Sequence, residues 1–130
     1  MNPISSLTDS ELDEACAVEV HGWYEKAIQD SKCWYDVDRN HRECVRQYRP
    51  TSNDAQGLAV FDEAAKRVGA GYLEINRIHF AGSNLWEAIM RPPMIGFEVK
   101  DVVACEAATR PRALCECAIL AVRTFNRGSQ

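Results

Sequence analysis

The sequence lacks any long apolar run. Within its 130 residues, no stretch approaches the roughly 18 consecutive apolar residues that a membrane-spanning helix requires. The first residues, 1–9, contain neither the basic start nor the apolar centre of a secretory signal. We therefore expect a protein that remains in the cytoplasm and has no membrane partner.

An excess of positive charge is also missing. The formal net charge is −4, whereas general nucleic-acid binders are normally basic. Hydrophobic residues make up 46% of the chain and charged residues 26%, which is the balance of a globular protein. We predict a single domain over residues 1–130, with a flexible lead at 1–6, a flexible tail at 128–130 and no general nucleic-acid binding.

Familiar catalytic and cofactor motifs are absent too. The sequence contains no Gly-x-Gly-x-x-Gly, no Walker loop, no His-Glu-x-x-His and no Gly-x-Ser-x-Gly. Its 6 cysteines include no Cys-x2–4-Cys pair of the kind that structural zinc sites favour. In a reducing compartment, cysteines are more often buried small hydrophobes than disulfides. We therefore predict no catalytic residue, no metal and no cofactor, and a protein that is not an enzyme.

Apolar periodicity predicts two helices in the first half of the chain. Thr8 and Glu11 form a capping-box pattern, which predicts a first helix over about residues 9–21. A second helix begins after Thr51 or Ser52 as cap and ends at Gly69. Its predicted apolar face consists of Leu58, Phe61, Ala65 and Val68.

The last third of the chain predicts a strand that runs into a third helix. Alternation places Phe97, Val99, Val103, Cys105 and Ala107 on one face of a strand over 95–107. Thr109 is the expected N-cap of the helix that follows. Its continuous apolar stripe consists of Leu114, Cys117, Ala118, Ala121, Val122 and Phe125.

Two further strands precede this unit, at 72–80 and 85–91, and the short links between them favour an antiparallel meander. A short edge strand is predicted at 33–37, and the rest of 24–50 is interpreted as an excursion over the surface with room for a helical turn. The predicted fold class is α+β: a three-layer α/β/α sandwich with a mainly antiparallel sheet of three to four strands and helices on both faces.

Three blocks of this sequence resemble the small bacteriophage proteins of the phage ABA sandwich family. The first block is Leu-Thr-Asp-Ser-Glu-Leu-Asp-Glu-Ala at 7–15, which closes on Gly22-Trp23. The second is Pro-Thr-Ser-Asn-Asp at 50–54, and the third is Thr-Arg-Pro-Arg-Ala-Leu-Cys-Glu-Cys-Ala at 109–118. This sequence departs from the family pattern at two positions: it has Cys117 where the family usually has alanine, and Glu116 where the family usually has arginine. The resemblance implies the α/β/α fold and a phage or prophage source, and it implies no catalytic residue.

Arginines recur in the segment between the first two predicted helices. Arg39, Arg42, Arg46 and Arg49 have helical spacing, so a helix here would gather them into one stripe. Guanidinium groups bind phosphates bidentately, and His41 and Tyr48 could add a proton donor and a stacking surface. These six residues are the predicted ligand-binding site. A solvated surface, with the arginines paired to neighbouring acids, is the competing interpretation.

The working function is a non-enzymatic phage accessory protein that binds a host component, such as a defence or regulatory protein. One alternative is a pocket that sequesters a nucleotide-like anion through the arginine group. Another is a small hydrolase or transferase that uses Cys44, whose arginine neighbours would favour the thiolate. An exposed apolar face on any helix would favour a homodimer.

Overall fold

The computed structural model describes residues 4–80, 82–91 and 102–125. Within these ranges, no helix has both the length and the apolar character that crossing a membrane requires. The elements in chain order are η1 (Ile4–Ser6), α1 (Asp9–Ala15), η2 (Cys16–Val20), β1 (Tyr24–Ile28), β2 (Ser31–Tyr35), β3 (His41–Cys44), α2 (Asp54–Val68), β4 (Tyr72–Phe80), β5 (Ser83–Arg91), β6 (Val103–Ala107) and α3 (Arg110–Phe125).

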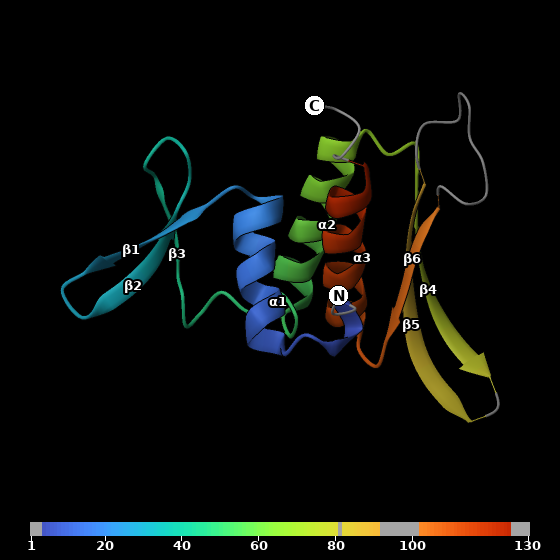
Figure 1. Cartoon of the computed structure of the whole chain (residues 1–130). Coiled ribbons are helices and arrows are strands. Elements are labelled where there is room, and N and C mark those ends of the chain that lie inside the picture. Colours follow the sequence, from blue (N-terminus) through green and yellow to red (C-terminus); the bar gives the residue numbers. More distant parts are fainter. Residues whose placement is uncertain (1–3, 81, 92–101, 126–130) are drawn as a thin grey trace.

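The fold is α+β, as predicted, but it contains two sheets. Each is three-stranded and antiparallel, with strand orders β1-β2-β3 and β4-β5-β6. Figure 1 shows α1, α2 and α3 between the two sheets, so all three helices lie on the same side of the β4–β6 sheet. A single sheet with helices on both faces is therefore not confirmed.

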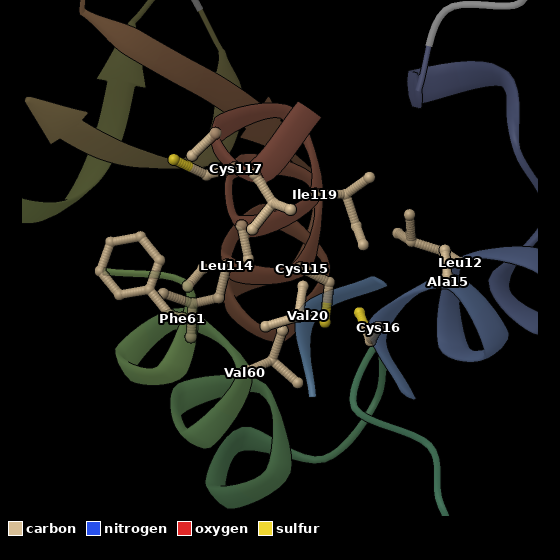
Figure 2. Packing of buried hydrophobic residues seen from close by; sticks show 14 of the residues in the cluster. Leu12, Ala15, Cys16, Val20, Val60, Phe61, Leu114, Cys115, Cys117 and Ile119 are labelled. Carbon is tan, nitrogen blue, oxygen red and sulfur yellow. The ribbon is translucent and has the colours of Figure 1, made fainter. Parts of the chain in front are cut away.

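Helix α3 forms the centre of the hydrophobic core. It packs against α2 and against strands β5 and β6, and Figure 2 shows its side chains in contact with several elements. The predicted stripe is confirmed: Leu114, Cys117 and Val122 are at most 6% exposed. Burial extends beyond this stripe to Cys115 and Ile119, which are fully buried. Helix α3 is therefore enclosed on most of its circumference.

The first helix begins as predicted. The Thr8 hydroxyl accepts a hydrogen bond from the Glu11 amide (3.1 Å), and the Glu11 carboxylate accepts one from the Thr8 amide (2.8 Å). After Ala15 the helix widens into the π-helical turn η2, the kind of local irregularity that often accompanies a functional site. Residues 4–6, which belong to the predicted lead, form η1, and Ile4 packs on the core.

The second helix differs from its prediction at the cap and at the buried face. The N-cap is Asn53, whose side chain accepts a hydrogen bond from the Gln56 amide (2.9 Å), not Thr51 or Ser52. Gly69 ends the helix in the left-handed conformation (φ 68°), as predicted. Leu58, which was placed on the apolar face, is 44% exposed. Phe61 and Ala65 of the predicted face are buried, and Gly57, Val60 and Ala64 complete the buried face.

The β4–β6 sheet confirms most of the strand predictions. Strands β4 and β5 coincide with the predicted segments to within two residues, and β6 covers the end of the third. Val103 and Ala107 are buried and Cys105 is partly buried, so they share the core face as expected. Phe97 and Val99 lie outside the described residues.

The segment 24–50 contains more strand than was predicted. It forms the three-stranded sheet β1–β2–β3, here called the arm (Tyr24–Cys44), which projects away from the helices in Figure 1. The predicted edge strand at 33–37 corresponds to β2, which is the central strand. Only Cys33 and Trp34 of the arm's strand residues are buried, and every residue of β1 is exposed.

Candidate functional site

The four arginines do not form one stripe, because the segment that carries them is not helical. Arg39 lies in the turn between β2 and β3 with φ +68°, and Arg42 lies in β3. Arg46 and Arg49 follow in the connection to α2. The structure thus distributes the predicted cluster over separate surfaces, and ligand binding by these residues stays a prediction.

Arg42 is engaged by Asp36, at the other end of the β2–β3 turn. Its Nε and Nη2 lie 3.0 and 2.9 Å from Oδ2 of Asp36. Asp36 also accepts hydrogen bonds from the backbone amides of Asn40 (3.0 Å) and Asp38 (2.9 Å). These amides, led by that of Asn40, together with Arg42 lower the pKa of the Asp36 carboxyl below its usual value. Arg42 and Asp36 therefore fix the β2–β3 turn.

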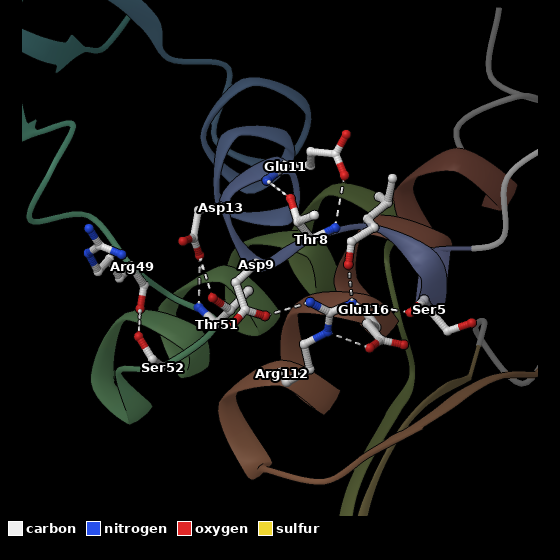
Figure 3. A network of polar contacts seen from close by, with 11 residues as sticks. Ser5, Thr8, Asp9, Glu11, Asp13, Arg49, Thr51, Ser52, Arg112 and Glu116 are labelled. Atoms are coloured by element: carbon white, nitrogen blue, oxygen red, sulfur yellow. Dashed lines mark hydrogen bonds and ion pairs between the residues drawn. The ribbon is translucent and has the colours of Figure 1, made fainter.

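Arg46 and Arg49 border a second, smaller hollow. This hollow has a volume of about 320 Å³, and Asp13, Trp34 and Tyr48 also line it. The Arg49 Nε donates to the carbonyl oxygen of Arg46 (2.9 Å), and the Arg49 amide donates to the Gln56 side chain (2.7 Å). Asp13 is held deeper, where it accepts hydrogen bonds from the amide and hydroxyl of Thr51 at 3.0 and 2.8 Å (Figure 3).

A further hollow is a cleft of about 680 Å³ between the arm and α2. Aromatic rings line one part of it. The His21 ring stacks on Trp23 with 4.2 Å between centroids, and Trp23 is 5.1 Å from Tyr48. Burial lowers the pKa of His21 from 6.5 to about 4, with a further contribution from the positive charges of Arg67 and Arg42, although Glu63 opposes it. His21 is therefore a neutral imidazole near neutral pH.

Tyr48, which was predicted to add a stacking surface, is largely buried. Its side chain is 5% exposed and belongs to the hydrophobic core. Its hydroxyl has no hydrogen-bond partner in the part of the chain that the structure describes. Burial raises the pKa of this phenol strongly, and the neighbouring Cys16 and Cys115 thiols contribute to the rise. Tyr48 anchors the end of the arm to the helices.

A second constellation, within the arm, is brought together by strand pairing. Cys33 lies opposite Cys44 and Tyr35 lies opposite His41, with 3.9 Å between the two Sγ atoms. One ligand atom from each of Cys33, His41 and Cys44 falls within 4.8 Å of the others. Their spacing in the sequence shows no zinc-knuckle pattern, so only the register of the sheet reveals that they converge.

An aromatic row continues from this group across the arm. The Tyr24 ring stacks on Tyr35 (5.9 Å), and Tyr35 meets His41 edge to face (5.6 Å). Tyr24 is 40% exposed. This row could not be recognised from the sequence, because β1 was not predicted. The available signal was the spacing of Cys33 and Tyr35, which share one face of the strand predicted at 33–37.

Fold and site together define a small α+β protein whose helical core carries a projecting β-sheet arm. Its fold is similar to that of a phage protein from Bacillus cereus ATCC 14579, with a TM-score of 0.59 and 13% identity over 91% of this chain and 90% of that chain. At this level of identity the similarity establishes the fold alone. Neither a protein-family model nor a curated protein matches the sequence, so membership of the phage ABA sandwich family stays a prediction.

Proposed function

We propose that this protein acts by binding another protein, and that the arm is the surface it uses. The observation that carries the proposal is the exposed first strand, in which all five residues of Tyr24–Ile28 are accessible, next to the row formed by Tyr24, Tyr35 and His41. An exposed edge strand offers backbone groups to a partner strand. Tyrosine is enriched among the residues that dominate protein–protein binding.

The setting we propose is an infected bacterium, where the protein is a phage accessory protein that binds a host defence or regulatory component. Two independent likenesses support this setting. The fold is similar to that of a phage protein, and three sequence blocks resemble a phage family. The proposal includes the cytoplasm of the host as its location.

A nucleotide-like anion held by the arginine group is a less well supported ligand. The large cleft contains five acidic side chains and three basic ones, namely Asp36, Asp38, Glu43, Asp62 and Glu63 against Arg42, Lys66 and Arg67. A negatively charged ligand would meet this surplus of carboxylates. Arg42 is also already bound to Asp36, and Arg67 is bound to Glu63.

The test compares two tyrosines that occupy equivalent places on the two sheets. Tyr24 begins β1 and is 40% exposed, whereas Tyr72 begins β4 and is 46% exposed. Full-length wild type, Tyr24→Ala and Tyr72→Ala are used as bait in bacterial lysate. Complexes are then quantified by size-exclusion chromatography and mass spectrometry. We expect a stoichiometric protein partner with wild type and Tyr72→Ala, and its loss with Tyr24→Ala. A partner that is lost only with Tyr72→Ala, or no stoichiometric partner at all, would refute the proposal.

A further inference from the structure

We propose that the arm contains a zinc-class metal site formed by Cys33, His41 and Cys44. Thiolate sulfur and imidazole nitrogen are the preferred protein ligands of Zn²⁺. The three side chains come from two adjacent strands, β2 and β3, and a ligand atom of each lies within 4.8 Å of the other two. The inference concerns the arm itself and does not depend on its use as a binding surface.

The sulfur positions match the geometry that the metal requires. With a Zn–S bond of about 2.3 Å and tetrahedral angles, two thiolate ligands of one ion lie about 3.8 Å apart. The Sγ atoms of Cys33 and Cys44 are 3.9 Å apart, so an ion could bind both with little movement. A disulfide would instead require the sulfurs to approach to about 2.05 Å.

A β-bulge accounts for the third ligand. Cys33 pairs with Cys44 and Trp34 with Glu43, but the register shifts at the next step, so that Tyr35 pairs with His41. In a regular ladder Arg42 would lie opposite Tyr35, on the same face as the two thiols. The extra residue in β3 places His41 on this face instead and leaves Arg42 to bind Asp36. Bulges commonly redirect a side chain in this way.

The arm has a structural need for such a cross-link. Among its strand residues only Cys33 and Trp34 are buried, so hydrophobic burial contributes little to holding three short strands together. An ion bound by Cys33 on β2 and by His41 and Cys44 on β3 would tie these strands to each other. Small units with too little core often depend on a metal in this way. Three protein ligands leave the fourth position of a tetrahedral ion to water.

The experiment titrates the reduced full-length protein with Co²⁺ and then with Zn²⁺. We expect one Co²⁺ per chain, with the thiolate charge-transfer and visible bands of a tetrahedral Cys₂His site, and displacement of this ion by Zn²⁺. Loss of even an outer-shell partner costs about 10- to 100-fold in metal affinity. Cys33→Ser, Cys44→Ser and His41→Gln should therefore each weaken binding at least about tenfold.

Cys105→Ser and His79→Gln are the matched controls, because they remove a cysteine and a histidine from the β4–β6 sheet. Both should bind Co²⁺ as the wild type does. His41 is exposed, so His41→Gln should fold normally, which circular dichroism would verify. This variant therefore tests the site even if a cysteine variant fails to fold. No Co²⁺ binding by the reduced wild type, or binding that survives His41→Gln unchanged, would overturn the proposal. Reduced thiols that form only a disulfide on air oxidation and bind no metal would also overturn it.

The result is independent of the partner experiment. Tyr24→Ala keeps all three proposed ligands, so it should bind Co²⁺ normally even if it loses the protein partner. Conversely, a wild type that captures its partner but binds no metal would refute the metal site alone.

Discussion

Acidification should destabilise this protein through His21. The imidazole is half-buried, stacks on Trp23 and titrates with a pKa of about 4 in the folded chain, against 6.5 as its ordinary value. The unfolded chain therefore binds a proton on His21 at pH values where the folded chain does not. The stability that the neutral ring contributes is present above about pH 6.5 and is lost as the pH falls from about 6.5 to about 4.

The magnitude follows from the change in proton affinity. Each tenfold change in proton affinity is worth about 1.4 kcal/mol. A change in pKa from 6.5 to about 4 therefore corresponds to about 3 kcal/mol before screening. The ring is partly exposed, so screening by solvent lowers our expectation to about 2 kcal/mol. Asp36 and Asp54 have carboxyls whose pKa values are lowered from 3.8. These carboxyls are protonated, and their stabilising interactions are lost, only at pH values near and below 3.8. The two pH windows are thus distinct.

The assay is urea denaturation at a series of pH values between about 7.5 and 4, together with NMR titration of the histidine ring protons. His21→Phe keeps a flat ring on Trp23 and removes the ionisable nitrogens, so its stability should vary much less over this range. His79→Gln is the control, because His79 is exposed and its loss should leave the fall unchanged. A His21 resonance that titrates near 6.5, or a His21→Phe variant with the same fall as wild type, would refute the reasoning.

Three substitutions test the packing of the core, each by the midpoint of urea unfolding. Gly57→Ala would place a methyl group 2.9 Å from the carbonyl oxygen of Pro50, and such overpacking should destabilise the protein by about 1–3 kcal/mol. Asp13→Ala would leave the buried amide and hydroxyl of Thr51 without their acceptor, at a cost of about 1–3 kcal/mol, and Asp13→Asn should recover part of this loss. Leu114→Ala would open a cavity at a side chain that is 1% exposed, and it should cost about 2–5 kcal/mol. A change below about 0.5 kcal/mol, the range of ordinary surface substitutions, would contradict the packing assigned to that residue.

Periodicity predicted the elements that bury a continuous face. Helix α3 and strands β5 and β6 place apolar residues against the core, so their patterns identified them. Strand β4 was also predicted, although its Leu73 and Ile75 are exposed. The buried face of α2 was identified only in part, because the pattern gave weight to large side chains such as Leu58. The structure buries Gly57 and Ala64 instead, since small residues let two helices approach closely. Hydrophobicity alone does not reveal this kind of contact.

The arm could not be predicted in the same way, because its strands bury almost nothing. Every residue of β1 is exposed, so no alternation marks it. The tight turn to β2 contains Gln29 at φ +56°, where Asn or Gly is the usual signal of a hairpin. Because the arm was not predicted, the spacing of the arginines was interpreted as compatible with a helix. Likewise, the convergence of Cys33, His41 and Cys44 depends on a register and a bulge that no sequence pattern specifies.

The separation between arm and core has a consequence for how this protein works. The arm is joined to the helices through a few anchors: its own Trp34 lies in the core, and so does Tyr48 in the connection that follows the arm. Before the arm, the carbonyl oxygen of His21 accepts a hydrogen bond from Arg67 (3.2 Å). The aromatic row of the arm contributes little to the burial that stabilises the fold. A substitution such as Tyr24→Ala therefore removes contact surface without opening a cavity. A loss of binding by that variant would reflect the arm's own surface, because the helical core that determines global stability remains intact.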